Sequence, residues 1–158
     1  MMNDIVIKIA QKDDAKEIAL LTEKLLMEIM ETVGDYFFSF DLEEAILILE
    51  SYISENIYVI FLALYEGKII GFISLGESHA IYAGGVFGTI LEFYVEPSYR
   101  SLYIGRMLLE EVKKFSDLKG YKRLEVTTPP LPAYERSLSF YKANGFCVTG
   151  GRKMKISL

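Results

Sequence analysis

Apolar and polar positions along the chain follow two periods, one of about two residues and one of about 3.6 residues. The shorter period, in runs rich in β-branched and aromatic residues, predicts strands. The clearest pair is a hairpin that turns at Glu66-Gly67. The predicted strands cover residues 5–10, the two arms of 56–78, 89–95, 123–128, 146–150 and 152–158.

The longer period predicts four helices. Two of them begin at acidic pairs three residues apart, Asp14 with Glu17 and Asp41 with Glu44, which resemble capping boxes. Glycine marks the end of the third helix, at Gly120. The helices cover residues 14–31, 41–53, 104–119 and 133–145, and the Gly-rich segment 76–88 is predicted to be a loop.

These elements follow the order β-α-α-β-β-β-α-β-α-β-β. No internal repeat, low-complexity segment or linker interrupts them. The pattern therefore predicts a single mixed α/β domain over residues 1–158.

Composition excludes several classes of protein. The 17 basic and 22 acidic residues give a net charge of −5, which disfavours nucleic-acid binding and favours a cationic partner or a solvated acidic surface. With one cysteine, Cys147, and one histidine, His79, neither an intramolecular disulfide nor a metal site is expected. Early charges and the lack of a long apolar run predict no signal peptide or membrane contact, and a cytoplasmic location.

The segment VEPSYRSLYIGRMLLEEV, residues 95–112, joins a strand to a helix. A helix N-terminus presents unpaired N–H groups and a partial positive charge, so it can bind phosphate. Arg100 and Arg106 would add charge, and Gly105 would let the backbone approach an anion. The alternative is a plain strand–turn–helix with two solvated arginines. Neither GxxxxGK[ST] nor a GxGxxG after a strand is present.

Val95-x-Pro97-x-Tyr99-Arg100, followed by Ile104-Gly105-Arg106 and Leu108-Leu109, resembles the acyl-CoA signature of the GNAT superfamily of N-acetyltransferases. The segments 124–126 and 139–146 resemble the strand and the helix end that follow it in that superfamily. The resemblance implies a GNAT-like acyltransferase fold and acetyl-CoA as cofactor. It also implies a mostly antiparallel sheet, splayed between strands 89–95 and 123–128, with the pantetheine arm in the gap.

The resemblance implies a cofactor site made of Phe93, Tyr94, Val95, Arg100, Ser101, Leu102, Tyr103, Ile104, Gly105 and Arg106. Two residues depart from the pattern, because Tyr103 and Ser101 stand where glycine is usual. A positive φ at Tyr103 would cost on the order of 1 kcal/mol or more. We expect an ordinary helical φ there instead. Tyr134 stands where the family commonly has an asparagine that contacts pantetheine.

The same resemblance assigns catalytic roles. The Val95 amide would polarise the thioester carbonyl, and Tyr141 would protonate the departing thiolate, unless it only packs against its helix neighbours. An acceptor amine of pKa near 10.4 costs about 4.6 kcal/mol to deprotonate at pH 7, so a general base is needed. Glu92 and Glu125 are the candidates, with Glu92 narrowly preferred; either can instead be a strand-surface charge.

The acceptor site is expected in residues 27–40, where the superfamily usually builds the wall that faces its acceptor. Acidic side chains there would attract a cationic amine, and aromatic side chains would shape a pocket; the alternative is that the aromatics belong to the core. The acidic candidates are Glu28, Glu31 and Asp35, and the aromatic ones are Tyr36, Phe37, Phe38 and Phe40.

The sequence therefore predicts an enzyme that transfers an acetyl group from acetyl-CoA directly to the primary amine of a small molecule. The alternative is a GNAT-like domain that binds acyl-CoA or a protein without catalysis, which Tyr103 and Tyr134 favour. A third class, acting on charged tRNA, is disfavoured by the net charge of −5. The family resemblance also implies a homodimer built through the C-terminal strands.

Overall fold

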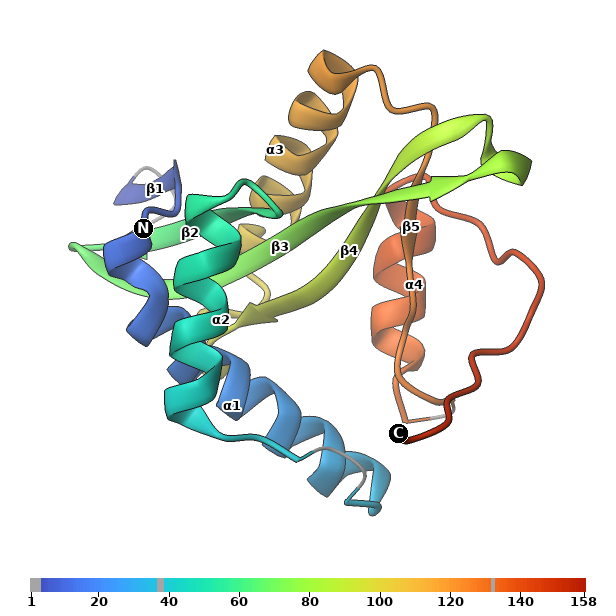
Figure 1. Ribbon diagram of the computed structural model, residues 1–158. Coiled ribbons are helices and arrows are strands. Elements are labelled where there is room, and N and C mark those ends of the chain that lie inside the picture. The colour runs from blue at the N-terminus through green and yellow to red at the C-terminus, as the bar shows by residue number, and fades with distance from the viewer. Residues whose placement is uncertain (1–3, 37–38, 132) are drawn as a thin grey trace. The chain divides into compact units, whose positions relative to one another are not determined.

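The computed structural model describes residues 4–36, 39–131 and 133–158. The chain divides into two compact units, Met1–Thr127 and Thr128–Leu158, and each is considered by itself. In its described residues, the first unit contains a five-stranded sheet with three α-helices, and the second contains one α-helix (Figure 1). No described helix is both long enough and apolar enough to cross a membrane. The single domain over residues 1–158 stays a prediction.

The sheet is mostly antiparallel, as the sequence predicts. Strands β1 to β4 pair in chain order with antiparallel neighbours, and β5 adds to β4 in parallel. The mixed α/β fold class is therefore confirmed. The strands are β1 (Ile5–Ile9), β2 (Tyr58–Tyr65), β3 (Lys68–Ala80), β4 (Gly85–Val95) and β5 (Leu124–Val126).

The hairpin of β3 and β4 is longer than predicted. The loop expected over residues 76–88 is wrong, because β3 continues to Ala80 and β4 already begins at Gly85. Gly76 and Gly88 in this segment allow close packing within the strands. A β-carbon at Gly88 would lie 2.6 Å from Leu124 Cδ2. Gly84 and Gly85, with φ of 76° and 114°, need the conformational freedom of glycine at the turn between the strands.

Helices cover both faces of the sheet (Figure 1). Helices α1 (Ala15–Val33) and α2 (Leu42–Ser54) pack on one face, where Ile18 of α1 shares a core with Leu62 and Phe72. Side chains alternate along a strand, so Phe61 lies on the opposite face. There its ring meets Phe115 of α3 (Ile104–Lys119), with the centroids 6.2 Å apart.

The helix ends follow the predicted signals with one exception. Asp41 caps α2 by accepting a hydrogen bond from the Glu44 N–H at 2.9 Å. Asp14 instead accepts from the Gln11 N–H at 2.8 Å, so the predicted capping box with Glu17 is wrong. A 3₁₀ turn at Lys12–Asp14 precedes α1, and it draws this carboxylate back toward the turn's own start.

Strand β4 carries a β-bulge opposite β3. Ser74 of β3 faces two β4 residues, Leu91 and Glu92, where regular pairing would give it one. The extra residue shifts the in-out alternation of side chains along β4 by one position, so the residues after the bulge lie on the opposite face from the one that a regular strand would give them.

Strands β4 and β5 pair over a short distance and then diverge. The described ladder has three residue pairs and ends at Ile90–Val126. Beyond it β4 continues to Val95, paired with β3 only, and is followed by the 3₁₀ turn Pro97–Tyr99 and α3. The predicted splay between the two strands is confirmed, and among the described residues no strand pairs with this edge of β4 beyond Ile90.

The second unit contains α4 (Glu135–Ala143), which ends near Gly145 with φ of 94°. Strands predicted over 146–150 and 152–158 are wrong, since residues 146–158 have no regular secondary structure. A two-stranded hairpin is marginal without a sheet or helix to cover it. Val148 and Ile156 are accordingly exposed. The homodimer expected through these strands stays a prediction.

Gly71→Ala is expected to destabilise the chain, because an added β-carbon would lie 2.9 Å from the Tyr94 carbonyl oxygen, a backbone atom that cannot move aside. We expect a loss of about 1–3 kcal/mol in the free energy of unfolding, measured in urea. Gly150→Ala is the matched control, since nothing lies within 4 Å of its β-carbon. Equal stability of the two variants would contradict the close approach at Gly71.

Candidate active site

The open edge of β4 presents the backbone of alternate residues. Glu96 donates its N–H to the Ile70 carbonyl at 2.8 Å, which fixes the alternation of this antiparallel pair. The N–H and C=O groups of Phe93 and Val95 therefore point away from β3, toward the side where β5 has ended. Tyr94, between them, pairs with β3 and buries its side chain in the core under α1.

The turn before α3 has a left-handed backbone at two non-glycine residues. Ser101 has φ of 64° and Tyr103 has φ of 62°. The expectation of a helical φ at Tyr103 is wrong. The residue is the N-cap of α3 and lies just outside the helix, and its side chain is 63% exposed. The chain thus keeps a backbone suited to glycine and accepts strain of order 1–3 kcal/mol per residue.

The first turn of α3 contains the remaining predicted phosphate-binding residues. The helix's first backbone bond runs from Met107 N–H to Tyr103 C=O at 3.0 Å. The N–H groups of Ile104, Gly105 and Arg106 therefore have no acceptor within the helix. Ile104 buries its side chain in the core, whereas Arg106 is exposed.

Arg100 points toward α1. Its guanidinium forms a bidentate ion pair with Glu28, with both N···O distances 2.8 Å, and its Nε donates to the Val95 carbonyl at 2.8 Å. It also lies over the Tyr94 ring, 5.3 Å from the centroid. Glu28, which the sequence predicts to bind the acceptor amine, binds Arg100 with both carboxylate oxygens. Arg100 thus joins the end of β4 to α1 through its side chain.

Glu92 occupies the bulge and is partly buried on the face under α1 and α2. Its Oε1 accepts a hydrogen bond from the Ser74 hydroxyl at 2.5 Å, and its N–H donates to the same hydroxyl oxygen at 2.9 Å. Burial raises the pKa of Glu92 above its ordinary value of 4.5, and the Ser74 hydrogen bond opposes this rise. Burial and the nearby Glu92 charge likewise raise the pKa of Tyr58.

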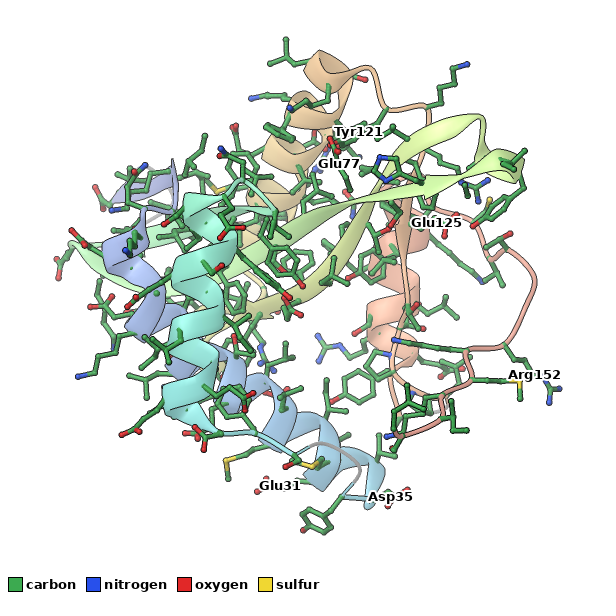
Figure 2. The ribbon with its side chains drawn as sticks, in the orientation of Figure 1. Glu31, Asp35, Glu77, Tyr121, Glu125 and Arg152 are labelled. Carbon is green, nitrogen blue, oxygen red and sulfur yellow. The ribbon has the colours of Figure 1, made fainter. Side chains whose placement is uncertain are left out.

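The other candidate base, Glu125, lies on β5 opposite Thr89. Its carboxylate forms an ion pair with Arg123 at 2.8 Å. Arg123 also lies over the ring of Phe87, 5.8 Å from its centroid. Glu125 thus belongs to a surface cluster at the β3–β4 hairpin, where Tyr121 also donates to Glu77 at 2.6 Å (Figure 2).

The predicted acceptor residues at the end of α1 are exposed. Figure 2 shows Glu31 and Asp35 projecting from this end, and Tyr36 beside them is 77% exposed. Phe37 and Phe38, predicted for the same pocket, lie outside the described residues.

Tyr141 of α4 is buried, at 8% exposure, and packs edge-to-face on Phe140 and Phe146 with centroids 5.4 and 5.3 Å away. Burial raises the pKa of Tyr141 to about 12. The phenol therefore keeps its proton at neutral pH.

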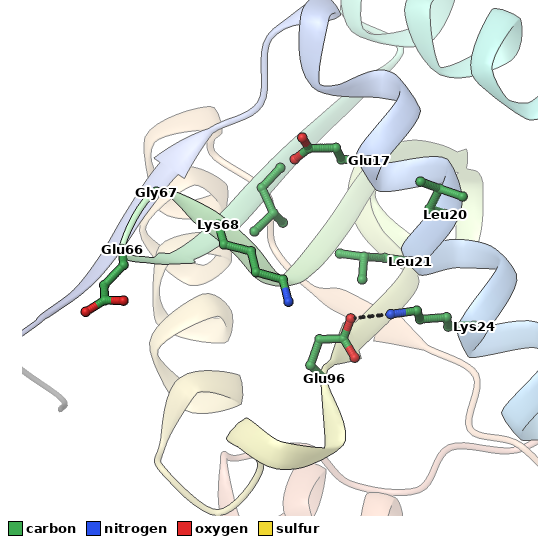
Figure 3. Close-up of a pocket in the computed structure, with 9 residues that line it drawn as sticks. Glu17, Leu20, Leu21, Lys24, Glu66, Gly67, Lys68 and Glu96 are labelled. Atoms are coloured by element: carbon green, nitrogen blue, oxygen red, sulfur yellow. Dashed lines mark hydrogen bonds and ion pairs between the residues drawn. The ribbon is translucent and has the colours of Figure 1, made fainter.

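A pocket of about 440 Å³ lies between α1, the β2–β3 turn and the end of β4 (Figure 3). The Lys24–Glu96 ion pair, with an N···O distance of 2.7 Å, crosses its wall. These two charges are therefore paired with each other. Over residues 4–36, 39–131 and 133–158, no group of His, Cys, Asp and Glu side chains could hold a metal ion.

Sequence reasoning missed Ser74 and Tyr58. Ser74 is fully buried in the apolar run IIGFISLGES, and an isolated polar residue at such a position needs a hydrogen-bond partner. That partner could not be found from the sequence, because it depends on the bulge in a strand 18 residues away.

Comparison with protein families decides the relationship. The sequence profile described as the Acetyltransferase (GNAT) family matches residues 26–146. The chain belongs to the GNAT family. The family resemblance inferred from the sequence is confirmed, and the chain is an acetyltransferase by this membership. No curated protein matches the sequence.

Solved GNAT structures share the fold across the whole chain. A predicted acetyltransferase from Clostridium acetobutylicum, solved with acetyl-CoA, has a TM-score of 0.80 and 15% identity, and the match covers 97% of this chain and 96% of that one. An aminoglycoside acetyltransferase from an uncultured soil metagenomic sample, solved with sisomicin, has a TM-score of 0.76, 19% identity and coverage of 99% and 97%. Ribosomal-protein-alanine N-acetyltransferase from Brucella melitensis has a TM-score of 0.72, 16% identity and coverage of 97% and 99%.

The GNAT chain's own residues fit an acyl-CoA. The N–H of Val95 points away from β3, and the first N–H groups of α3 have no acceptor within the helix, so an extended arm and a phosphate could bind there. Ser101 and Tyr103, which stand where the family pattern has glycine, have the left-handed φ that glycine adopts without strain.

Tyr103→Gly is expected to raise the free energy of unfolding by about 1 kcal/mol, because it removes the left-handed strain and little packing. Leu102→Gly is the matched control: Leu102 has no positive φ, so glycine there should cost about 0.5–1 kcal/mol. Urea unfolding of both variants measures the difference. A loss of stability in Tyr103→Gly equal to that in Leu102→Gly would show that the turn is not strained.

Proposed function

We propose that this chain transfers an acetyl group from acetyl-CoA to the primary amine of a small molecule, with Glu92 as general base. The observation that carries the proposal is the partly buried Glu92 carboxylate, held in the bulge by Ser74 three residues before Val95. A carboxylate that is shielded from water is a stronger proton acceptor, and Glu92 is partly buried with a raised pKa, whereas the Glu125 carboxylate is paired with Arg123.

Acetyl-CoA, when bound, supplies the thioester whose acetyl group is transferred. The N–H groups at the start of α3 would hold its pyrophosphate, and Phe93 and Val95 would pair with its pantetheine arm. The Val95 N–H would donate to the acyl carbonyl oxygen as negative charge develops there. Arg100 would keep that part of β4 in place through the Val95 carbonyl.

Tyr141 would act on the leaving group. A phenol whose pKa is raised to about 12 is a weaker acid than a thiol of pKa near 8.5. We therefore assign Tyr141 a hydrogen bond to the developing thiolate, with proton transfer completed only as the thiolate departs.

The acceptor would be a compact cation. The net charge of −5 and the exposed Glu31 and Asp35 favour a positively charged amine. The neighbour solved with sisomicin supports testing aminoglycosides together with polyamines and amino acids.

Thermal unfolding tests cofactor binding. Acetyl-CoA at 100 times its Kd should raise Tm by about 5–10 °C, since it stabilises the folded chain by about 2.7 kcal/mol. CoA should give a similar rise, and acetate at the same concentration should give none. The absence of a shift with millimolar acetyl-CoA would overturn the proposed cofactor.

Glu92→Gln tests the base. We expect kcat/KM to fall by about 10²–10⁴-fold, measured as CoA release with the best amine of the panel. Because burial raises the pKa of Glu92, the acid limb of the wild-type pH profile should lie above pH 4.5, with activity rising as the carboxylate loses its proton.

Glu125→Gln is the matched variant on the neighbouring strand. It should change kcat/KM by less than about threefold, because its carboxylate is paired with Arg123 and not held in the bulge. The reverse ranking of the two variants would assign the base to Glu125.

A further inference from the structure

Ser74 is the fully buried hydroxyl beneath the β4 bulge. A serine hydroxyl has one proton and two lone pairs. Here the proton is donated to Glu92 Oε1 at 2.5 Å, and a lone pair accepts the Glu92 N–H at 2.9 Å. One side chain therefore binds both the backbone and the carboxylate of the same residue.

We propose that Ser74 is a positioning residue, whose hydroxyl fixes the Glu92 carboxylate in the bulge and leaves Oε2 to take the proton of the acceptor amine. This inference rests on the proposed role of Glu92 as general base. Oε2 has no hydrogen-bond partner among the described residues. In the proton transfer an N–H bond of the ammonium breaks and an O–H bond forms at Oε2. The freed nitrogen lone pair then attacks the acyl carbon.

The hydrogen bond also favours the ionised form of the carboxylate. A partly buried carboxylate tends to hold its proton, and a donor such as Ser74 favours the charged form. The ionisable side chain that faces Glu92 from β2 is Tyr58, with Tyr52 of α2 packed behind it at 5.0 Å between ring centroids. Both are phenols, which carry no positive charge, so neither replaces the Ser74 proton.

A purely structural role for Ser74 makes a different prediction. Ser78, four residues along the same strand, bonds to Thr89 Oγ1 at 2.7 Å and has the same kind of hydroxyl between β3 and β4. If hydroxyls here only stabilise the hairpin, Ser74→Ala and Ser78→Ala should both lower Tm and leave the titration of Glu92 unchanged. If Ser74 positions the base, only Ser74→Ala should change that titration.

The experiment follows the Glu92 carboxyl by ¹³C NMR from pH 3 to 9 without substrate, with Glu92→Gln identifying the signal. In Ser74→Ala the pKa of Glu92 should rise, because the opposing hydrogen bond is gone. The acid limb of kcat/KM should move to higher pH, with a loss of about tenfold or more at pH 7. Ser78→Ala should titrate and turn over like the wild type.

Two conservative variants at Ser74 separate loss of the hydroxyl from loss of the fold. Ser74→Thr retains the hydroxyl and should restore the wild-type titration and acid limb. Should Ser74→Ala fail to fold, Ser74→Cys replaces it, and its weaker donor should give a smaller rise in the same pKa. A Glu92 titration that is unchanged in the variants lacking the hydroxyl overturns the role of Ser74. Full kcat/KM in Glu92→Gln instead overturns the proposed base, even where the titration moves.

Discussion

The β-bulge opposite Ser74 is the constraint on which the candidate site depends. It puts Glu92 and Tyr94 on the face covered by α1, and Phe93 on the face covered by α3. In a regular strand these side chains would exchange faces. The same extra residue directs the backbone groups of Phe93 and Val95 toward the edge that β5 leaves open. A carboxylate and a set of backbone donors thus come close together, because one strand is one residue longer than its partner requires.

The turn between β4 and α3 has Ser101 and Tyr103 at the two positions where the family pattern has glycine. Ser101 and Tyr103 adopt the left-handed conformation at a cost that glycine avoids. Arg100, beside them, is tied to Glu28 and to the Val95 carbonyl. These contacts anchor the strained turn to α1 and β4, and a turn anchored on both sides can hold an unfavourable φ. The Arg100 side chain thus holds the end of β4 against α1, and phosphate binding at the start of α3 stays a prediction.

Much of the fold could be predicted from the sequence, because it depends on local signals. The helical stripes, the Glu66-Gly67 turn, the Asp41 cap and the Gly120 stop each act within a few residues. Errors arose where distant partners decide the outcome. Gly76 and Gly88 lie within strands, where side chains from neighbouring strands come too close for a β-carbon to fit easily. The C-terminal apolar side chains Val148 and Ile156 are exposed, so no sheet covers them. The family motif predicted the position of the turn before α3. The contact of Ser74 with Glu92 could not be predicted, because it depends on the bulge in β4.

A general base inside a sheet faces two opposed requirements. Burial strengthens a carboxylate as a proton acceptor by raising its pKa, yet too large a rise leaves it protonated and useless at neutral pH. Burial raises the pKa of Glu92, and the Ser74 hydrogen bond opposes this rise. Glu125 instead has a charged partner, the Arg123 guanidinium. The partner of Glu92 is the neutral Ser74 hydroxyl. This difference in partners, rather than a difference in residue type, is the physical reason for assigning the proton transfer to Glu92.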